Sequence, residues 1–310
     1  MSVEEIDART ASDEVLTQIV ALEHACWPEV SPGEPLRDVD ESIAFYRHQP
    51  STHTTCFWLT DGGFAALFVH GPTAAFVRLY VHPERRRLGI GSALLRTAVA
   101  RAQELEVRAV HAHHTTLEGA AFTASHGFTD GQRIVASHLQ LPTAELPEAR
   151  VSEGWELVTW LRRVPDEHLD AFVLARTSMD DAPTPEEMDF PAFTAEKVRE
   201  SEESLARRRR EMRVTVALRP DGVVGSFTEL RWSHGSTLGF TDDTGTAREF
   251  RRLGLARAVK TESLRRLRAD HPEIELVTTS NAEENAVMRR INESIGFRPT
   301  VVETTATLKL

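Results

Sequence analysis

Two segments rich in arginine and glycine have the composition of a phosphate-binding turn. The first runs Arg86-Arg87-Leu88-Gly89-Ile90-Gly91 and the second runs Arg251-Arg252-Leu253-Gly254-Leu255-Ala256. Each follows a run that reads as a strand and opens a segment whose apolar spacing is typical of a helix. A helix N-terminus exposes about four unpaired N–H groups and a partial positive charge. Because a pyrophosphate satisfies both, each segment predicts an anion site.

The glycines have a physical use in such a turn. At Gly89 and Gly254 the backbone can approach phosphate oxygens with no Cβ in the way, and it can adopt φ > 0. One glycine at a strand–helix junction is usually structural, whereas two at matching places favour a ligand site. No GxGxxG follows the first predicted strand and no GxxxxGK[ST] occurs, so Rossmann and P-loop sites fit poorly. The expected anion ligands are Arg86, Arg87, Gly89, Gly91 and Ser92 in the first segment and Arg251, Arg252, Gly254, Ala256 and Arg257 in the second.

Both segments belong to an internal repeat. Arg86 and Arg251 are 165 residues apart, and so are Gly89 and Gly254. Further along, Gly127-Phe128 recurs as Gly296-Phe297 at an offset of 169. Matched blocks in the same order indicate a duplicated domain with a small insertion. The predicted domains are 1–141 and 153–310, joined by a linker at 142–152.

The elements that would position these turns also repeat along the chain. Apolar periodicity and turn residues predict mixed strands with helices after the fourth and fifth, which is typical of a three-layer α/β fold. The first copy is predicted to have helices at 12–25, 36–48, 90–105 and 117–126 and strands at 53–60, 63–70, 74–82, 107–113 and 132–141. The second copy is predicted to have helices at 166–177, 194–210, 254–269 and 283–294 and strands at 155–161, 212–219, 222–232, 236–246, 274–280 and 300–309, with a proline-rich loop at 180–193.

The composition narrows the class of protein. The 310 residues are 41% hydrophobic and 27% charged, which is typical of a soluble globular chain, and the length fits either one large domain or two of roughly 150 residues. A net charge of -11 argues against nucleic-acid binding and is compatible with a cationic amine substrate. Two cysteines with no CxxC predict reduced thiols. No apolar run approaches the roughly 18 residues of a membrane span, and the acidic N-terminus lacks a signal-peptide pattern. We therefore expect a cytoplasmic protein.

The motifs together resemble the GNAT acetyltransferase superfamily. The match consists of Val81-x-Pro83 at a strand end, the Arg-x-x-Gly-x-Gly turn after it, and a distal helix ending in Gly-Phe. The two copies cover nearly the whole chain, an arrangement similar to mycothiol synthase and related two-domain members, which acetylate amino groups of small metabolites. The resemblance implies two tandem α/β domains, each with a mixed, mostly antiparallel sheet flanked by helices.

The resemblance also implies acetyl-CoA as co-substrate and no metal. The pyrophosphate would lie on the turn, and the pantetheine arm would lie in a gap beside the fourth strand, which a β-bulge commonly opens. A main-chain N–H near Val81 or Thr246 would stabilise the tetrahedral oxyanion. Leu79 and Thr244 lie on the same strands and are further candidates for contact with CoA.

Two positions on the distal helix have roles in the family. An asparagine there commonly contacts the pantetheine, and a tyrosine can protonate the departing thiolate. Counting back from Gly296 places Asn285 and Asn292 at these positions, and the same count in the first copy gives Thr116 and Thr123. Loss of the tyrosine need not abolish turnover, because a thiol with a pKa of about 8.5 leaves tolerably well without an acid.

The acceptor amine needs a base, because an alkylammonium with a pKa of about 10.4 is only about 0.1% neutral at pH 7. Asp242 and Asp243 end a predicted strand before Thr244, and Glu229 lies on the preceding strand. The first copy has Arg78 at the place of Asp243. We therefore expect the second copy to be catalytic, with Asp242, Asp243, Glu229 and Asn292 as its candidate catalytic residues. The alternative is that the two aspartates only end a strand in solvent.

Three functions stay open at this point. The favoured one is acetylation of a small-molecule amine, and the second is acetylation of a protein or peptide amine. The third is a catalytically silent acyl-CoA-binding protein, which the missing tyrosines would favour. The run His111-Ala-His113-His114 resembles a metal cluster, but with no acidic or cysteine partner placed nearby it is interpreted as strand histidines.

Overall fold

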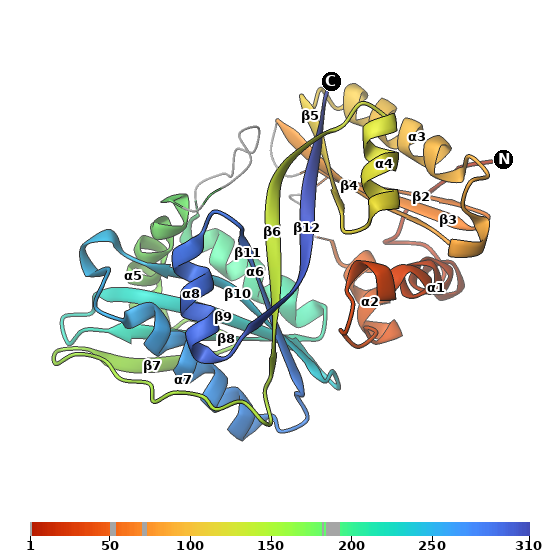
Figure 1. Ribbon diagram of the computed structural model, residues 1–310. Helices are drawn as coiled ribbons and strands as arrows, with labels where there is room; N and C mark the ends of the chain where they lie inside the picture. The colour runs from red at the N-terminus through yellow and green to blue at the C-terminus, as the bar shows by residue number, and fades with distance from the viewer. Residues whose placement is uncertain (1, 50–53, 70–72, 182, 184–192) are drawn as a thin grey trace. The chain divides into compact units, whose positions relative to one another are not determined.

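The computed structural model describes residues 2–49, 54–69, 73–181, 183 and 193–310, which form two compact units (Figure 1). The first unit contains Met1–Ile134 and Val301–Leu310, and the second contains Val135–Pro183 and Ala192–Thr300. In the described part of the chain, no helix is long and apolar enough to span a membrane.

The first unit is a six-stranded mixed sheet in the order β1-β2-β3-β4-β5-β12. Strands β1 to β4 are antiparallel, β4 and β5 are parallel, and β12 runs antiparallel to β5. The strands are β1 (Glu4–Ile6), β2 (Thr54–Thr60), β3 (Gly63–Val69), β4 (Ala74–Val81), β5 (Ala109–His114) and, from residue 301 on, β12 (Arg298–Lys309). The helices are α1 (Asp13–Val30), α2 (Val39–Arg47), α3 (Ile90–Glu104) and α4 (Leu117–Ser125).

Alternation along β3 explains why this sheet is covered on both faces. Phe64 and Phe68 pack with α1 and α2, whereas Ala65 and Leu67 pack with α3. Successive side chains of a strand point to opposite faces, so a strand that is apolar throughout requires helices on both sides. The result is the three-layer arrangement that the sequence predicts, with α1 and α2 opposite α3 (Figure 1).

The second unit repeats this plan with the strand order β6-β11-β10-β9-β8-β7. Strands β10 and β11 are parallel, and β7 to β10 are antiparallel. Its strands are β7 (Glu156–Leu161), β8 (Arg210–Leu218), β9 (Val224–Ser233), β10 (Leu238–Thr246), β11 (Leu276–Ala282) and, from residue 135 on, β6 (Thr129–Gln140). Its helices are α5 (Asp166–Arg176), α6 (Ala195–Arg207), α7 (Leu255–Asp270) and α8 (Ala286–Ile295), and short 3₁₀ turns occupy Pro83–Arg85, Thr177–Asp181 and Arg248–Phe250.

Each unit takes its last strand from the other half of the sequence. Residues of β12 pair with β5 from Thr304↔His114 to Lys309↔Ala109, inside the first unit. Residues 135–140 of β6 lie beside β11 in the second unit. The compact units therefore differ from two contiguous halves by an exchange of strands. The domain limits 1–141 and 153–310 stay a prediction.

The helices and strands that the sequence predicts are present, with ends shifted by a few residues. The largest shift is at α1, which continues to Val30 rather than ending at 25. Strand β1 was not predicted, because three residues are too few for a periodic pattern. The predicted loop at 180–193 lies mostly outside the described residues.

Candidate functional site

Both predicted anion-binding turns have the same backbone. Gly89 starts α3 with φ of 79° and Gly254 starts α7 with φ of 77°. Two residues earlier, Arg87 and Arg252 are also left-handed, with φ of 65° and 68°. Turns that contain left-handed residues form concave nests of N–H groups that bind anions. A Cβ placed on either glycine meets no atom within 4 Å, so the space in front of both turns is open.

The first arginine of each turn is held by the protein itself. Arg86 Nε donates to the Val81 carbonyl and Arg251 Nε donates to the Thr246 carbonyl, both at 3.3 Å. A carboxylate from an earlier helical segment completes each contact, with Glu29 of α1 at 2.9 Å from Arg86 and Asp181 of the 3₁₀ turn Thr177–Asp181 at 2.6 Å from Arg251. These arginines therefore tie the turn to the end of β4 or β10. Arg87, Arg252 and Arg257 are exposed at the turns, and Arg251 is exposed as well although it is paired with Asp181.

Helix α4 packs closely on the start of α3 in the first unit. A Cβ on Gly91 would lie 3.2 Å from the Phe122 ring. The Ser92 hydroxyl lies 2.9 Å from His126 Nε2, so this predicted phosphate ligand already has a partner. In the second unit Ala256 stands at the place of Gly91 and is half-buried, and Arg257 stands at the place of Ser92 and is exposed.

In both units the pairing of the fourth strand with the fifth ends before the fourth strand does. Strand β4 pairs with β5 only over Ala74–Phe76, and β10 pairs with β11 only over Leu238–Thr241. The following residues, 77–81 and 242–246, continue beyond these pairings, and the predicted CoA contacts fall on them. Leu79 and Val81 join an apolar cluster with Phe122. Thr244 and Thr246 instead bond Thr228 at 2.7 Å and Ser226 at 2.9 Å through their hydroxyls.

A β-bulge distinguishes the second unit. Thr241 pairs with Leu230 and Thr244 pairs with Thr228, so Asp242 and Asp243 stand opposite Glu229 alone. Bulges bend a strand and re-aim its side chains, and they are common beside active sites. The β3–β4 ladder of the first unit has no such interruption between Gly63↔Val81 and Val69↔Ala75.

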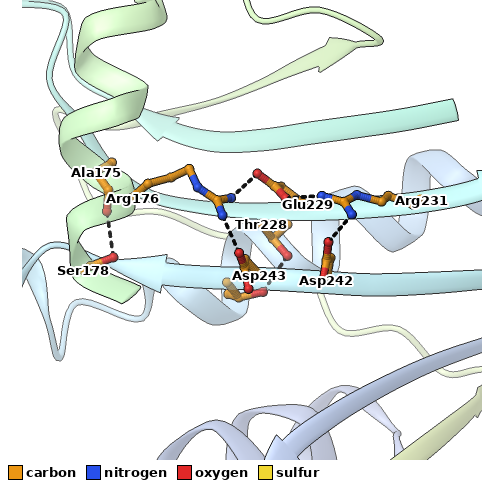
Figure 2. Close-up of polar contacts among 9 residues, drawn as sticks. Ala175, Arg176, Ser178, Thr228, Glu229, Arg231, Asp242 and Asp243 are labelled. Carbon is orange, nitrogen blue, oxygen red and sulfur yellow. Dashed lines mark hydrogen bonds and ion pairs between the residues drawn. The ribbon is translucent and has the colours of Figure 1, made fainter. Parts of the chain in front are cut away.

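The bulge brings three predicted acids together with two arginines (Figure 2). Arg176, at the end of α5, forms ion pairs with Glu229 and Asp243. Arg231 pairs with Glu229 at 3.1 Å and with Asp242 at 2.6 Å. We call Arg176, Glu229, Arg231, Asp242 and Asp243 the bulge cluster. With every group ionised, three carboxylates face two guanidinium groups, which leaves one excess negative charge.

Burial sets the electrostatics of the bulge cluster. It raises the pKa of Glu229, whose side chain is 4% exposed, against the opposing effect of both arginines. Burial and the charge of Asp242 raise the pKa of Asp243, and Arg176 opposes that rise. Asp243 is 34% exposed, so it combines a raised pKa with access to a ligand. Glu229 is better suited to hold the two arginines in place.

The two asparagines of α8 have other partners. Asn285 caps the helix, with its Oδ1 accepting from the Met288 N–H at 3.2 Å, as Thr116 does for Gly119 in α4. Asn292 is 2% exposed and donates to Asn281 Oδ1 at 2.6 Å, while its own buried Oδ1 has no hydrogen-bond partner among the described residues. The structure thus connects Asn292 to β11 rather than to the bulge cluster. An amide has no titratable proton to replace that of tyrosine.

The first unit holds a carboxylate that sequence reasoning missed. Glu23 of α1 is buried, accepts from the Tyr46 hydroxyl at 3.1 Å, and lies 3.9 Å from Arg78. Arg78 occupies the place of Asp243 in the repeat. In the first unit the helix carries the acid and the strand carries the arginine, whereas in the second unit the helix carries Arg176 and the strand carries Asp243. A half-buried arginine on β4 was the available signal, because such a group requires an acid nearby.

The three histidines of β5 have partners in the structure. His111 Nδ1 lies 2.9 Å from Thr307 Oγ1 and His113 Nδ1 lies 2.8 Å from Glu303, both on β12. His114 Nε2 lies 2.8 Å from Asp130. Within the described ranges, no group of three His, Cys, Asp or Glu is arranged to hold a metal ion.

Comparisons with known proteins agree with the resemblance to the GNAT superfamily. Residues 53–130 match the family model "Acetyltransferase (GNAT) domain". No curated protein matched the sequence. A tandem GNAT protein from the clavulanic acid biosynthesis pathway, solved without AcCoA, aligns with a TM-score of 0.81 and 24% identity over 99% of this chain and 98% of its own.

Two further solved structures align over nearly their full length. A GCN5-related N-acetyltransferase from Sphaerobacter thermophilus has a TM-score of 0.71 at 16% identity, covering 99% of this chain and 95% of its own. A GNAT-family acetyltransferase from Colwellia psychrerythraea has a TM-score of 0.59 at 14% identity, covering 100% of both chains. Residues 53–130 therefore match a GNAT domain, the whole chain has the fold of a tandem GNAT protein, and the resemblance seen in the sequence is confirmed.

Proposed function

We propose that this chain transfers an acetyl group from acetyl-CoA to a primary amine of a small molecule, and that the second unit carries out the transfer. The observation that carries the proposal is the β10 bulge, which sets Asp242 and Asp243 between the end of the β10–β11 pairing and the open turn at Gly254. The first unit has an equally open turn at Gly89 but no bulge in the described β3–β4 ladder.

The residues present fit an acyl-CoA. Amides of the turn before α7 would hold the pyrophosphate, with Arg252 and Arg257 adding charge. The free edge of β10 at Thr244 and Thr246 would face the pantetheine. Acetyl-CoA supplies the activated acyl group.

The bulge cluster would prepare the acceptor for direct attack in a ternary complex. Its excess negative charge favours a cationic amine, and Asp243 would remove the proton that blocks the nitrogen lone pair. Nitrogen then bonds to the thioester carbon, and a main-chain N–H near Thr246 stabilises the oxyanion. The carbon–sulfur bond breaks with its electron pair leaving on sulfur as the CoA thiolate, and the nitrogen loses its second proton to solvent. Asp243 is favoured over Asp242 because it is the more exposed of the two carboxylates.

Binding and turnover assays separate this proposal from its alternatives. We expect isothermal titration to show binding of acetyl-CoA and CoA, and we expect thiol release in the presence of one class in a panel of small amines. Thiol release only with peptide amines would favour the protein-directed reaction. Binding without release on any amine would support a silent acyl-CoA-binding protein. The absence of a tyrosine at positions 123 and 292 favours that alternative.

A matched pair of variants tests which unit works. Gly254→Glu places a carboxylate where the pyrophosphate would bind, and Gly89→Glu does the same in the first unit. Both glycines are left-handed and open, so the backbone cost of the two changes is the same. We expect Gly254→Glu to abolish thiol release and Gly89→Glu to leave it largely intact. The reverse result would assign catalysis to the first unit.

A further inference from the structure

Phe240 is an exposed aromatic side chain on the strand that carries the bulge. It lies on β10, two and three residues before Asp242 and Asp243, and it is 38% exposed. In the register of β10 against β9 it stands opposite Arg231, which pairs with Asp242. Residues directly opposite on neighbouring strands place their side chains on the same face of a sheet. Phe240 and the bulge cluster therefore share one face of the second sheet.

The first unit has an aromatic ring at the corresponding place and covers it. Phe76 on β4 is the counterpart of Phe240 once the extra residue of the bulge is counted. The Phe76 ring centre lies 5.3 Å from that of His111 and 5.0 Å from that of His113, both on β5. In the first unit, therefore, the fifth strand supplies two rings that pack on the aromatic side chain of the fourth.

The fifth strand of the second unit supplies no such cover. Phe240 stands beside Thr278 of β11 in the parallel register, and Ser280 follows on the same face. Two small hydroxyl side chains thus replace the two imidazole rings, and in the described part of the chain no ring or cation is stacked on Phe240. A single exposed apolar side chain is ordinary. This one, however, lies beside the carboxylates that would receive the amine.

We propose that Phe240 selects the acceptor, and that the acceptor is a primary amine joined by a short chain to an apolar body. The ammonium would face Asp243 and the apolar body would pack on the Phe240 ring. This inference rests on the proposed function. Strand residues rise about 3.3 Å each, so Phe240 and Asp243 are at most about 10 Å apart along β10. Nitrogen and apolar body therefore need to be only a few atoms apart.

The test measures thiol release with ethylamine, butylamine and hexylamine, which differ in chain length and have nearly equal basicity. We expect the wild-type kcat/KM to rise at least about 10-fold from ethylamine to hexylamine, mainly through KM, since each methylene placed on an apolar surface adds to binding. This series tests the proposal even without a variant. Equal kcat/KM values for the three amines would overturn the selection by Phe240.

Variants of the ring assign the preference to Phe240. Phe240→Thr, which keeps a residue suited to a strand, should remove the rise with chain length. It should leave the kcat with ethylamine and the Kd for acetyl-CoA unchanged. Phe240→Leu retains an apolar side chain and should keep most of the rise, and Phe76→Thr, the matched change in the first unit, should keep all of it. A rise that persists in Phe240→Thr would overturn the proposal.

A diamine distinguishes an apolar body from a second charge. 1,6-Diaminohexane has the length of hexylamine with a cation in place of the apolar end. We expect it to have the lower kcat/KM of the two, and a higher value would show that the negative charge of the bulge cluster alone selects the acceptor. No thiol release with any amine overturns the proposed function, and the role of Phe240 with it. Turnover without a chain-length preference overturns the role of Phe240 alone.

Discussion

At the scale of single residues, Asp243 is the proposed base that removes a proton from the acceptor amine. We expect Asp243→Asn to lower kcat/KM by about 100-fold or more, since a positioned base contributes at least that factor. The Kd for acetyl-CoA should not change. Asp242→Asn, the neighbouring change in the same bulge, is the control and should have a smaller effect. Equal losses in both variants would show that the cluster as a whole matters, and would remove the specific role of Asp243.

The pH dependence of the wild type follows from the same carboxyl group. Burial and the neighbouring Asp242 raise the pKa of Asp243 above its ordinary 3.8. A base must be deprotonated, so kcat/KM should fall as the pH drops through this raised value. The Asp243→Asn variant should lack that acidic limb, and an unchanged limb in the variant would contradict the assignment.

Arg176 should matter for stability more than for chemistry. Arg176→Met leaves the buried Glu229 with one arginine instead of two and removes the partner of Asp243. Breaking a buried ion pair from one side typically costs about 3–5 kcal/mol. Urea unfolding should show a loss of that order, and Arg176→Met/Glu229→Met should recover part of it. A double variant no more stable than the single one would contradict the pairing.

Residues that repeat could be predicted, and residues that meet only through the fold could not. Asp242 and Asp243 stood out because they precede Thr244 at a place where the first copy has an arginine. Arg176 is 67 residues from Asp243 and ends a helix, where a basic residue needs no special explanation. Glu23 was missed for the same reason, because its partner Arg78 lies on a distant strand.

At the scale of elements, apolar periodicity and turn residues were sufficient to predict the helices and the strands other than β1, to within a few residues at their ends. The two turns were predictable because the glycines recur at a fixed offset, and both adopt the left-handed backbone expected of them. The existence of a bulge was implied by the resemblance. Its presence on β10, with no counterpart in the β3–β4 ladder, depends on the register of β10 against β9, which is a property of two strands together rather than of either sequence.

Lys260, which is buried on α7, should make the free energy of unfolding depend on pH. The folded pKa is about 7 against an ordinary 10.5, so the unfolded chain binds more protons between these values and stability rises with pH across that window. The slope approaches about 1.4 kcal/mol per pH unit for one proton. Lys260→Met should be the more stable protein at pH 7, and its advantage should shrink toward pH 10. A constant difference across the window would contradict this account.

At the scale of the whole molecule, the exchanged strands make each unit depend on the distant half of the sequence. His111 and Thr307 are hydrogen-bonded although they are 196 residues apart. Two contiguous domains are the simplest interpretation of a tandem repeat, and nothing in the local pattern of 298–309 shows which sheet it joins. The valines and threonines of this strand suit an edge position in either of the two sheets.

Removal of residues 301–310 should therefore weaken the first unit. The deletion takes away the ladder from Thr304↔His114 to Lys309↔Ala109 and exposes the edge of β5. We expect hydrogen exchange to accelerate at the amides of 109–114, while β8 and β9 keep their protection. Loss of protection confined to β8 and β9 would contradict the exchange of strands.

The central claim is that an acyl-CoA binds at the glycine turn of the second unit with its thioester toward the β10 bulge. A crystal structure of the chain soaked with acetyl-CoA tests this most directly. The account predicts pyrophosphate oxygens on the amides that follow Arg252, and the thioester beside Asp243. Density for CoA at Gly89 alone, or a pyrophosphate that contacts neither turn, would contradict it.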